Sequence, residues 1–290
     1  MFKNVVVGVD GSENARDGIA LATRLADPAG RLTLVHVHAG GLHPLRAVSP
    51  GVIAEERAES EQLLERERAA GDVEAELVSI VASSPGAGLH RQAEEQGADL
   101  LVVGSCSRGA FGRAMLGDDT RAALNGAPCA VAVAARGYAE YPTPIAKVGV
   151  GYNDTPESRT ALAVARTVAE PTRASVHVLE VVSIPTYAYS GFVPAVIGGG
   201  VDASIAEADE RLAQLPDVIA LAGYGLTGEE LAAFSEGVDI LVVGSRGYGP
   251  LRRLVLGSTS DYLERHARSS LLVLPRGAAG DAPAALPADV

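Results

Sequence analysis

The segments ADLLVVGS (98–105) and VDILVVGS (238–245) align without a gap at a separation of 140 residues, and the alignment extends to the glycines at 117 and 257. A second pair, VVVGVDGSENAR (5–16) and VGVGYNDTPESR (148–159), aligns at a separation of 143. Each apolar run ends in glycine, as expected for a buried strand that leads into a loop. The chain therefore consists almost entirely of two copies of one unit of about 140 residues.

Each unit alternates short apolar runs with amphipathic or charged segments. In the first unit we expect strands at 2–9, 31–38, 73–81, 98–105 and 129–135, and helices at 12–26, 54–70, 85–97 and 120–127. The second unit repeats this order, and its least clear strand is 217–223. Strands that alternate with helices form parallel sheets through right-handed crossovers. The sequence thus predicts an α/β fold with two repeated, doubly wound parallel sheets and helices on both faces.

The two units predict two domains, 1–137 and 146–276. The segment that joins them, 136–147, is polar and contains proline. The tail, 277–290, is rich in Ala, Pro and Gly, and we expect it to be disordered.

Composition excludes several classes of function. The net charge of -12 disfavours nucleic acid and anionic membranes as partners. The chain has two cysteines, too few for a disulfide framework, and no apolar run reaches the length of a membrane span. The sequence enters a strand directly from Met1, without a signal-peptide pattern, so we expect a cytoplasmic protein.

The candidate sites lie in two loops of each unit. In open parallel sheets, ligands bind at the carboxyl ends of the strands, where the strand order reverses. One such loop follows the first strand, at 9–12 and at 152–155. The other follows the fourth strand, at 104–117 and at 244–257.

The fourth-strand loop of the second unit has the strongest pattern, G-x2-G-x9-G-S, formed by Gly244, Gly247, Gly257 and Ser258. It is neither a Walker loop nor the G-x-G-x-x-G fingerprint. The glycines would let the backbone approach a ligand, and a helix that starts at Gly257-Ser258 would turn free N–H groups toward an anion. Positive charge nearby comes from Arg246, Arg252 and Arg253. The pattern indicates a phosphate site.

Taken together, these motifs resemble the universal stress protein family, with two such domains covering residues 1–276. The resemblance rests on the first loop GVDGS (8–12), on ADLLVVGS and on the glycine spacing at 244–258. It implies five-stranded sheets in the order 3-2-1-4-5. It also implies ATP binding in some members and a stress-linked regulatory role rather than a defined catalytic one.

The resemblance assigns nucleotide contacts residue by residue. In the second domain these are Gly151, Asn153, Thr155, Val181, Val243, Gly244, Gly247, Gly257, Ser258, Thr259 and Ser260. In the first domain the weaker set is Gly8, Asp10, Ser12, Val37, Gly104 and Gly117. The second domain has Asn153 where the family has aspartate. The first domain keeps Asp10 but has Ser107 in place of the second glycine and Asp118 in place of the phosphate-binding serine.

Electrostatics favours the second domain. A carboxylate about 4 Å from a phosphate costs roughly 4 kcal/mol at an effective dielectric constant near 20. An Asp-to-Asn change at a ribose contact costs on the order of 1 kcal/mol. We therefore expect about one ATP per chain, bound by the second domain.

Simpler explanations exist for several of these residues. Ser258 with Asp261, and Asp118 alone, could act only as helix caps. Cys106 is interpreted as a small loop residue rather than a redox centre. His36, His38 and His43 lack partners at metal-ligand spacing, so no metal site is predicted. No residue is assigned a catalytic role.

Three functions compete at this stage. The first is an ATP-binding stress-response regulator without strong catalysis, although slow ATP hydrolysis stays open. The second is an interaction protein of the same family that binds no nucleotide. The third is an ATP-hydrolysing or adenylyl-transferring enzyme of a related α/β fold, whose usual Ser-Gly-Gly loop is absent from the sequence.

Two structural expectations concern assembly and access. The last strands, 129–135 and 269–275, would be exposed apolar edges, so we expect them to pair within the chain as a pseudo-dimer. Pairing of whole chains into a homodimer is left open. The segment 183–200, with Tyr187, Tyr189 and Phe192, is expected to act as a lid over the nucleotide.

Overall fold

The computed structural model describes residues 1–38, 50–105, 118–142, 144–183, 197–245, 254 and 256–276. The first repeat follows the predicted alternation. Its elements are β1 (Phe2–Gly8), α1 (Glu13–Leu25), β2 (Ala26–His38), α2 (Pro50–Gly71), β3 (Glu76–Val81), α3 (Pro85–Gln96), β4 (Leu100–Gly104), α4 (Asp118–Leu124) and β5 (Ala130–Ala134).

The second repeat has the same order of elements. They are β6 (Lys147–Tyr152), α5 (Pro156–Ala169), the 3-10 turn η1 (Glu170–Thr172), β7 (Ser175–Ser183), α6 (Ile197–Leu212), β8 (Ile219–Gly225), α7 (Thr227–Phe234), the 3-10 turn η3 (Ser235–Gly237), β9 (Ile240–Gly244), α8 (Ser258–His266) and β10 (Ser270–Leu274).

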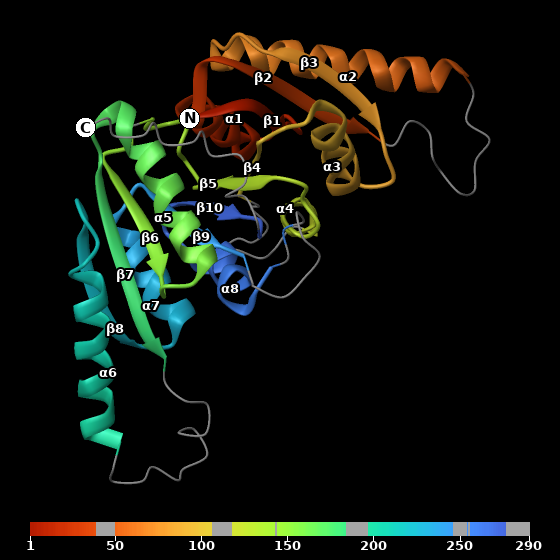
Figure 1. Cartoon of the computed structure of the whole chain (residues 1–290). Coiled ribbons are helices and arrows are strands. Elements are labelled where there is room, and N and C mark those ends of the chain that lie inside the picture. The colour runs from red at the N-terminus through yellow and green to blue at the C-terminus, as the bar shows by residue number, and fades with distance from the viewer. Residues whose placement is uncertain are drawn as a thin grey trace.

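The two repeats share one ten-stranded sheet, in the order β3-β2-β1-β4-β5-β10-β9-β6-β7-β8 (Figure 1). Each half has the order 3-2-1-4-5, as the resemblance implies, and all its neighbouring strands are parallel. The halves meet where β5 and β10 pair antiparallel, with Ala132 opposite Leu272. The predicted pairing of the two apolar edges within the chain is therefore confirmed.

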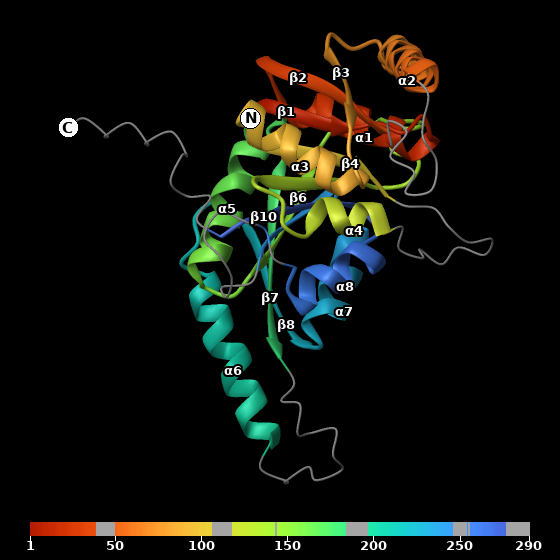
Figure 2. The ribbon, with the colours of Figure 1, turned by 90° about the vertical axis from the view of Figure 1, so that its right-hand side faces the viewer.

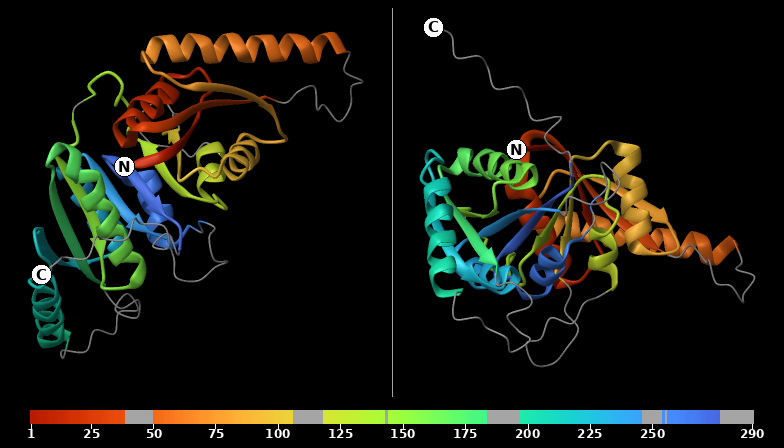
Figure 3. Two further views of the ribbon diagram at one scale, coloured as in Figure 1. Left: turned by 45° about the horizontal axis from the view of Figure 1, so that its top comes forward. Right: turned by 60° about the horizontal axis from the view of Figure 1, so that its bottom comes forward.

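Helices cover both faces of the sheet, as predicted for a doubly wound fold. On one face lie α1, α2, α5 and α6. Of these helices, α2 and α6 lie at opposite ends of the sheet (Figure 3). On the other face α3, α4, α8 and α7 follow one another in a row (Figure 2). Both hydrophobic cores contain side chains from both repeats, so the cores continue across the β5–β10 boundary.

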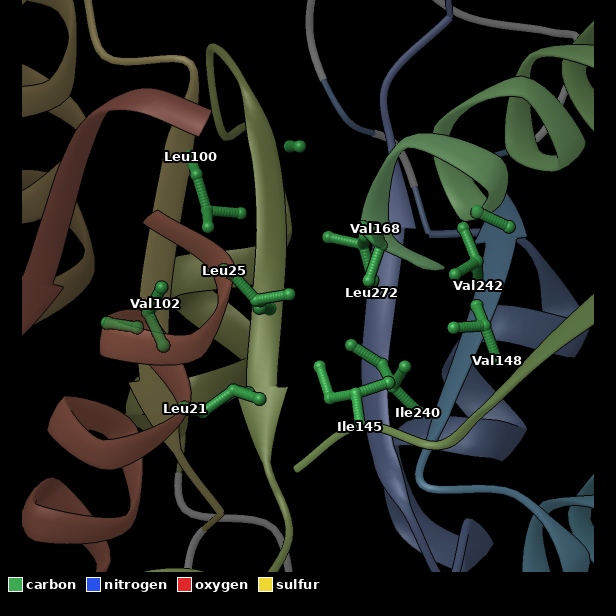
Figure 4. Packing of buried hydrophobic residues seen from close by; sticks show 14 of the residues in the cluster. Leu21, Leu25, Leu100, Val102, Ile145, Val148, Val168, Ile240, Val242 and Leu272 are labelled. Atoms are coloured by element: carbon green, nitrogen blue, oxygen red, sulfur yellow. The ribbon is translucent and has the colours of Figure 1, made fainter. Parts of the chain in front are cut away.

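The core at the boundary between the two halves is built from aliphatic side chains. Leu21 and Leu25 of α1 lie over β5, whose own side chains on this face are alanines, while Leu272 of β10 packs near Val168 of α5 (Figure 4). Large side chains thus come from the helix in the first half and from the strand in the second. This exchange keeps both halves close-packed.

The segment between the repeats is held onto α1. The Asp17 carboxylate, 3% exposed, accepts hydrogen bonds from the backbone N–H groups of Gly137 at 2.9 Å and Ala139 at 2.7 Å. A buried carboxylate is stable only with such partners. The segment between the repeats is therefore held against α1 by the hydrogen bonds of Asp17.

Some boundaries differ from the predicted ones. β2 begins at Ala26 instead of residue 31, because Phe2 of β1 pairs with Ala26 before the register shifts. α3 ends at the predicted place, with Gly97 in the left-handed conformation at φ 60°. Of the predicted lid, 183–200, the described ends belong to regular elements: residue 183 ends β7, and 197–200 begin α6. Residues 184–196 and the tail 277–290 lie outside the described part of the chain. None of the helices in the described ranges combines the length and the hydropathy of a membrane span.

Candidate functional site

The sheet has a reversal of strand order in each half. β6 leads through α5 to β7 on one side, while β9 lies on its other side in parallel register, with Val150 beside Val242. β1 has the same relation to β2 and β4. The loops after β6 and β9 therefore leave the sheet at adjacent carboxyl ends, which is where α/β sheets of this kind bind ligands.

The loop after β6 is ordered by its own side chains. Thr155 is the N-cap of α5, and its hydroxyl donates to Asn153 Oδ1 at 2.8 Å. Ser158 Oγ accepts from the backbone N–H groups of Asn153 at 3.3 Å and Thr155 at 3.0 Å. The Asn153 side chain is thus held in place by Thr155. This bond uses one lone pair of the Asn153 carbonyl oxygen and does not involve its amide N–H₂ group.

A carboxylate that the sequence argument overlooked stands beside Asn153. Asp154 has a left-handed backbone at φ 58°, and its Oδ1 accepts from Tyr152 Oη at 2.8 Å and Arg159 Nε at 2.9 Å. These two hydrogen bonds, that of Tyr152 first, lower the pKa of Asp154 below its usual value. The negative charge absent at 153 is therefore present one residue later, but it is directed to Tyr152 and Arg159.

The corresponding loop of the first half has the same backbone shape. Ser12 caps α1 and donates to Asp10 Oδ1 at 2.6 Å, and Gly11 has φ 78° where Asp154 has 58°. Here α2 lies close over the loop: a Cβ built on Gly11 would be 3.1 Å from Leu63 Cδ1 and 3.3 Å from Arg66 Nη2. The first-half loop is therefore partly covered by a helix, which the sequence did not indicate.

The glycines at the strand ends have a packing role. A Cβ on Gly244 would lie 2.8 Å from Glu157 Cβ and 3.0 Å from Glu157 O, and a Cβ on Gly104 would collide with the backbone carbonyl of Asn14. The first turn of α5 or α1 thus rests directly on the end of β9 or β4. The close approach that we expected of a ligand is made by a helix, and it brings the loops after β6 and β9 together.

Two more predicted glycines are also explained by packing. A Cβ on Gly151 would be 3.2 Å from a methyl group of Leu231, and one on Gly8 would be 2.9 Å from Leu89 Cδ1. These glycines let α7 and α3 approach the strands. Their role as nucleotide contacts stays a prediction.

Helix α8 begins at the predicted phosphate position. Its N-cap is Gly257, whose N–H donates to Ser260 Oγ at 2.9 Å. Ser258 is therefore the first helical residue and not a cap, so the alternative explanation of Ser258 and Asp261 as a helix cap is wrong. Ser260 is buried and serves the cap, while Ser258 is exposed and Thr259 half-buried. The accessible hydroxyls at this helix end are those of Ser258 and Thr259.

The predicted apolar contacts lie on the face covered by α7 and α3. Val243 of β9 is buried in the core of that face, and Val181 of β7 and Val37 of β2 pack against the same core while remaining half-buried. Val181 and Val37 thus occupy matching places in the two halves, near the carboxyl ends of their strands.

Several predicted residues lie outside the described part of the chain. These are Gly247, Gly117, Ser107, Cys106, His43, Arg246, Arg252 and Arg253. α4 begins at Asp118, the position that matches Ser258, but the side chain of Asp118 is not among those described.

A sequence model described as the universal stress protein family matches residues 1–135 and 144–275. The chain belongs to this family. A universal stress protein of Mycobacterium tuberculosis is 31% identical over 189 residues, which cover 61% of each chain. Another from the same organism is 28% identical over 212 residues, covering 66% of this chain and 69% of that one. This chain thus spans about three fifths of the length of the first of these relatives.

Solved structures agree with a tandem universal stress protein fold. A universal stress protein from Archaeoglobus fulgidus superimposes with a TM-score of 0.65 at 18% identity, over 94% of this chain and 98% of the other. A functionally unknown protein from Pseudomonas aeruginosa gives 0.59 at 16% identity, over 94% and 92%. The predicted family and fold class are confirmed.

Proposed function

We propose that this universal stress protein is an ATP-binding regulator whose second domain holds the nucleotide at the carboxyl ends of β6 and β9. The observation that carries the proposal is the ordered loop 153–155 at the carboxyl end of β6, which Glu157 brings against Gly244 at the end of β9. The chain continues from β9 to α8, whose first residue, Ser258, is exposed. The amide N–H groups of a helix N-terminus attract phosphate.

Each described residue has a chemical role in this proposal. Ser258 and Thr259 would donate from hydroxyl and backbone groups to the phosphates. Asn153 would meet the ribose, since its side chain is held by Thr155 and keeps hydrogen-bonding capacity. Val181 and Val243 would contact the adenine from the apolar side. Gly247 is proposed as a further backbone contact on its sequence spacing alone.

The first domain is proposed to bind nucleotide weakly or not at all. Asp118 stands at the start of α4, where the second domain has Ser258. α2 also lies over Gly11 in the loop that would face the ribose. Both features oppose a second site, so we expect one ATP per chain.

We propose no strong catalysis, because no described group near the loops forms a nucleophile–base pair. Cytoplasmic location, domain limits of 1–137 and 146–276, and a regulatory role in stress complete the proposal. A nucleotide-free interaction protein is the second candidate. It is favoured by the finding that Gly244 is explained by helix packing without any ligand.

Calorimetry with ATP, ADP and AMP tests the proposal. We expect one site per chain and an affinity that falls as phosphates are removed, because the α8 N-terminus recognises the phosphates. Two equal sites would contradict the assignment to the second domain. Absence of binding heat, together with absence of nucleotide released on denaturing the purified protein, would favour the interaction protein.

A further inference from the structure

The chain that leads into α8 is bonded to the first domain. Leu254, which is fully buried, donates its N–H to Ala127 O at 2.9 Å and accepts at its carbonyl from Gly126 N–H at 2.8 Å. Gly126 and Ala127 form the turn after α4. Leu254 stands three residues before Gly257, the N-cap of α8. Two backbone hydrogen bonds between domains therefore fix the chain just ahead of the proposed phosphate position.

A second contact fixes the same helix just after that position. Arg121 of α4 places Nη2 2.7 Å from Oδ1 of Asp261, which lies in the first turn of α8. Arg265 of α8 binds the other oxygen of Asp261 at 2.8 Å. Both sides of Gly257-Ser258 are thus tied to one short segment of the first domain, Arg121 to Ala127.

We propose that the first domain positions the nucleotide site of the second, with Arg121 and Gly126 as positioning residues. This inference rests on the proposed ATP binding and adds to it a task for the domain that has lost its own site. The amide N–H groups of Ser258 and Thr259 can meet a phosphate only if the first turn of α8 keeps its direction. Three contacts that set this direction cross the domain boundary: the two backbone hydrogen bonds of Leu254 and the Arg121–Asp261 ion pair. ATP binding and domain pairing are therefore coupled in both directions.

Gly126 offers a selective perturbation. Its φ of 95° lies in the left-handed region, and the nearest atoms to an added Cβ belong to the His90 ring at 3.6 Å and 3.8 Å. Gly126→Ala therefore adds strain, without a clash, to the backbone conformation that directs this N–H to Leu254. Gly97→Ala is the matched control, since Gly97 has φ 60°, has no atoms within 4 Å of an added Cβ and ends α3 away from this contact.

Two comparisons of ATP affinity test the proposal, at a temperature where all variants are folded. Gly126→Ala is expected to weaken ATP binding about tenfold relative to Gly97→Ala, in the range of measured couplings between sites. Arg121→Ala is expected to weaken it about threefold, and Arg121→Lys, which keeps the charge, should restore most of the affinity. Arg31→Ala, which removes an exposed pair with Glu76 at the far edge of the sheet, should change nothing. Equal affinities of the Gly126 and Gly97 variants would overturn the proposal.

Hydrogen exchange gives a test that needs no nucleotide. In ligand-free protein, Gly126→Ala should speed amide exchange of Leu254 and of the first turn of α8, and Gly97→Ala should not. If the wild type binds no ATP, the proposed function fails while this arm still decides whether the first domain orders α8. If exchange in α8 is the same in the two variants, the positioning role is refuted whatever the nucleotide result.

Discussion

The substitution Ser258→Asp tests the phosphate site most directly. Ser258 is exposed at the first position of α8, and the capping hydrogen bond joins Gly257 to Ser260, so an aspartate at 258 leaves that bond in place. A negative charge in the first turn of a helix stabilises it by about 0.3–1 kcal/mol. Folding stability should therefore stay equal or rise slightly, and a loss of ATP binding could not be attributed to unfolding.

The effect on binding follows from Coulomb's law. At about 4 Å from a phosphate oxygen, one added charge costs about 4 kcal/mol at an effective dielectric constant of 20 and about 1 kcal/mol in bulk water. Ser258 is exposed, so the value lies between these limits, which corresponds to a loss of ATP affinity of about tenfold to several hundredfold. AMP, whose single phosphate would lie farther from Ser258, should lose less.

Calorimetry of Ser258→Asp beside Ser258→Asn measures this effect. The asparagine variant has the same size without the charge and should retain most of the affinity. Raised salt should reduce the difference between the variants, because exposed charges are screened. Equal ATP affinities of the two folded variants at low salt would refute the placement of phosphate at this helix end.

Three further predictions concern stability and reactivity. Gly244→Ala should destabilise the fold by about 1–3 kcal/mol in urea unfolding even without nucleotide, because its methyl group would meet Glu157; an unchanged midpoint would reject the packing explanation. Leu272→Ala should cost about 2–5 kcal/mol and lower the midpoint of both halves together, since Leu272 is fully buried opposite Ala132; two separate transitions in the wild type would argue against a shared core. Burial raises the pKa of the Cys129 thiol to about 12, so Cys129 should resist alkylation at pH 8 until denaturant is added, as peptide mass spectrometry would show; rapid labelling of native protein would contradict its burial.

The sequence predicted those parts of the fold that repeat. Two copies of one strand-and-helix pattern gave the strand order of each half through the family resemblance, and the apolar character of 129–135 and 269–275 predicted their pairing. The sequence could not show that α2 covers Gly11, because the distance between Leu63 and Gly11 depends on the tilt of a long helix. Such tertiary contacts have no local signal.

The candidate site was predicted less completely than the fold. The loop 153–155 and the start of α8 lie where the motifs placed them, yet the glycine pattern had two meanings that sequence alone did not separate. Gly244 meets a helix, and Ser260 rather than Ser258 serves the cap. Asp154 has no signal in the family motif, whose acidic position corresponds to Asn153, one residue earlier. A glycine or a serine can serve helix packing, helix capping or ligand binding, and only its contacts in the folded structure distinguish these roles.

Joining the two halves in one chain permits a contact that a symmetric dimer could not contain. Arg121 and Asp261 are separated by 140 residues, so they occupy equivalent positions of the two repeats, and they bind each other across the boundary between the halves. In a dimer of identical subunits that position would face its own copy, and either residue would meet a like charge. In a single chain the two equivalent positions can hold different residues, so the boundary can join surfaces of opposite charge.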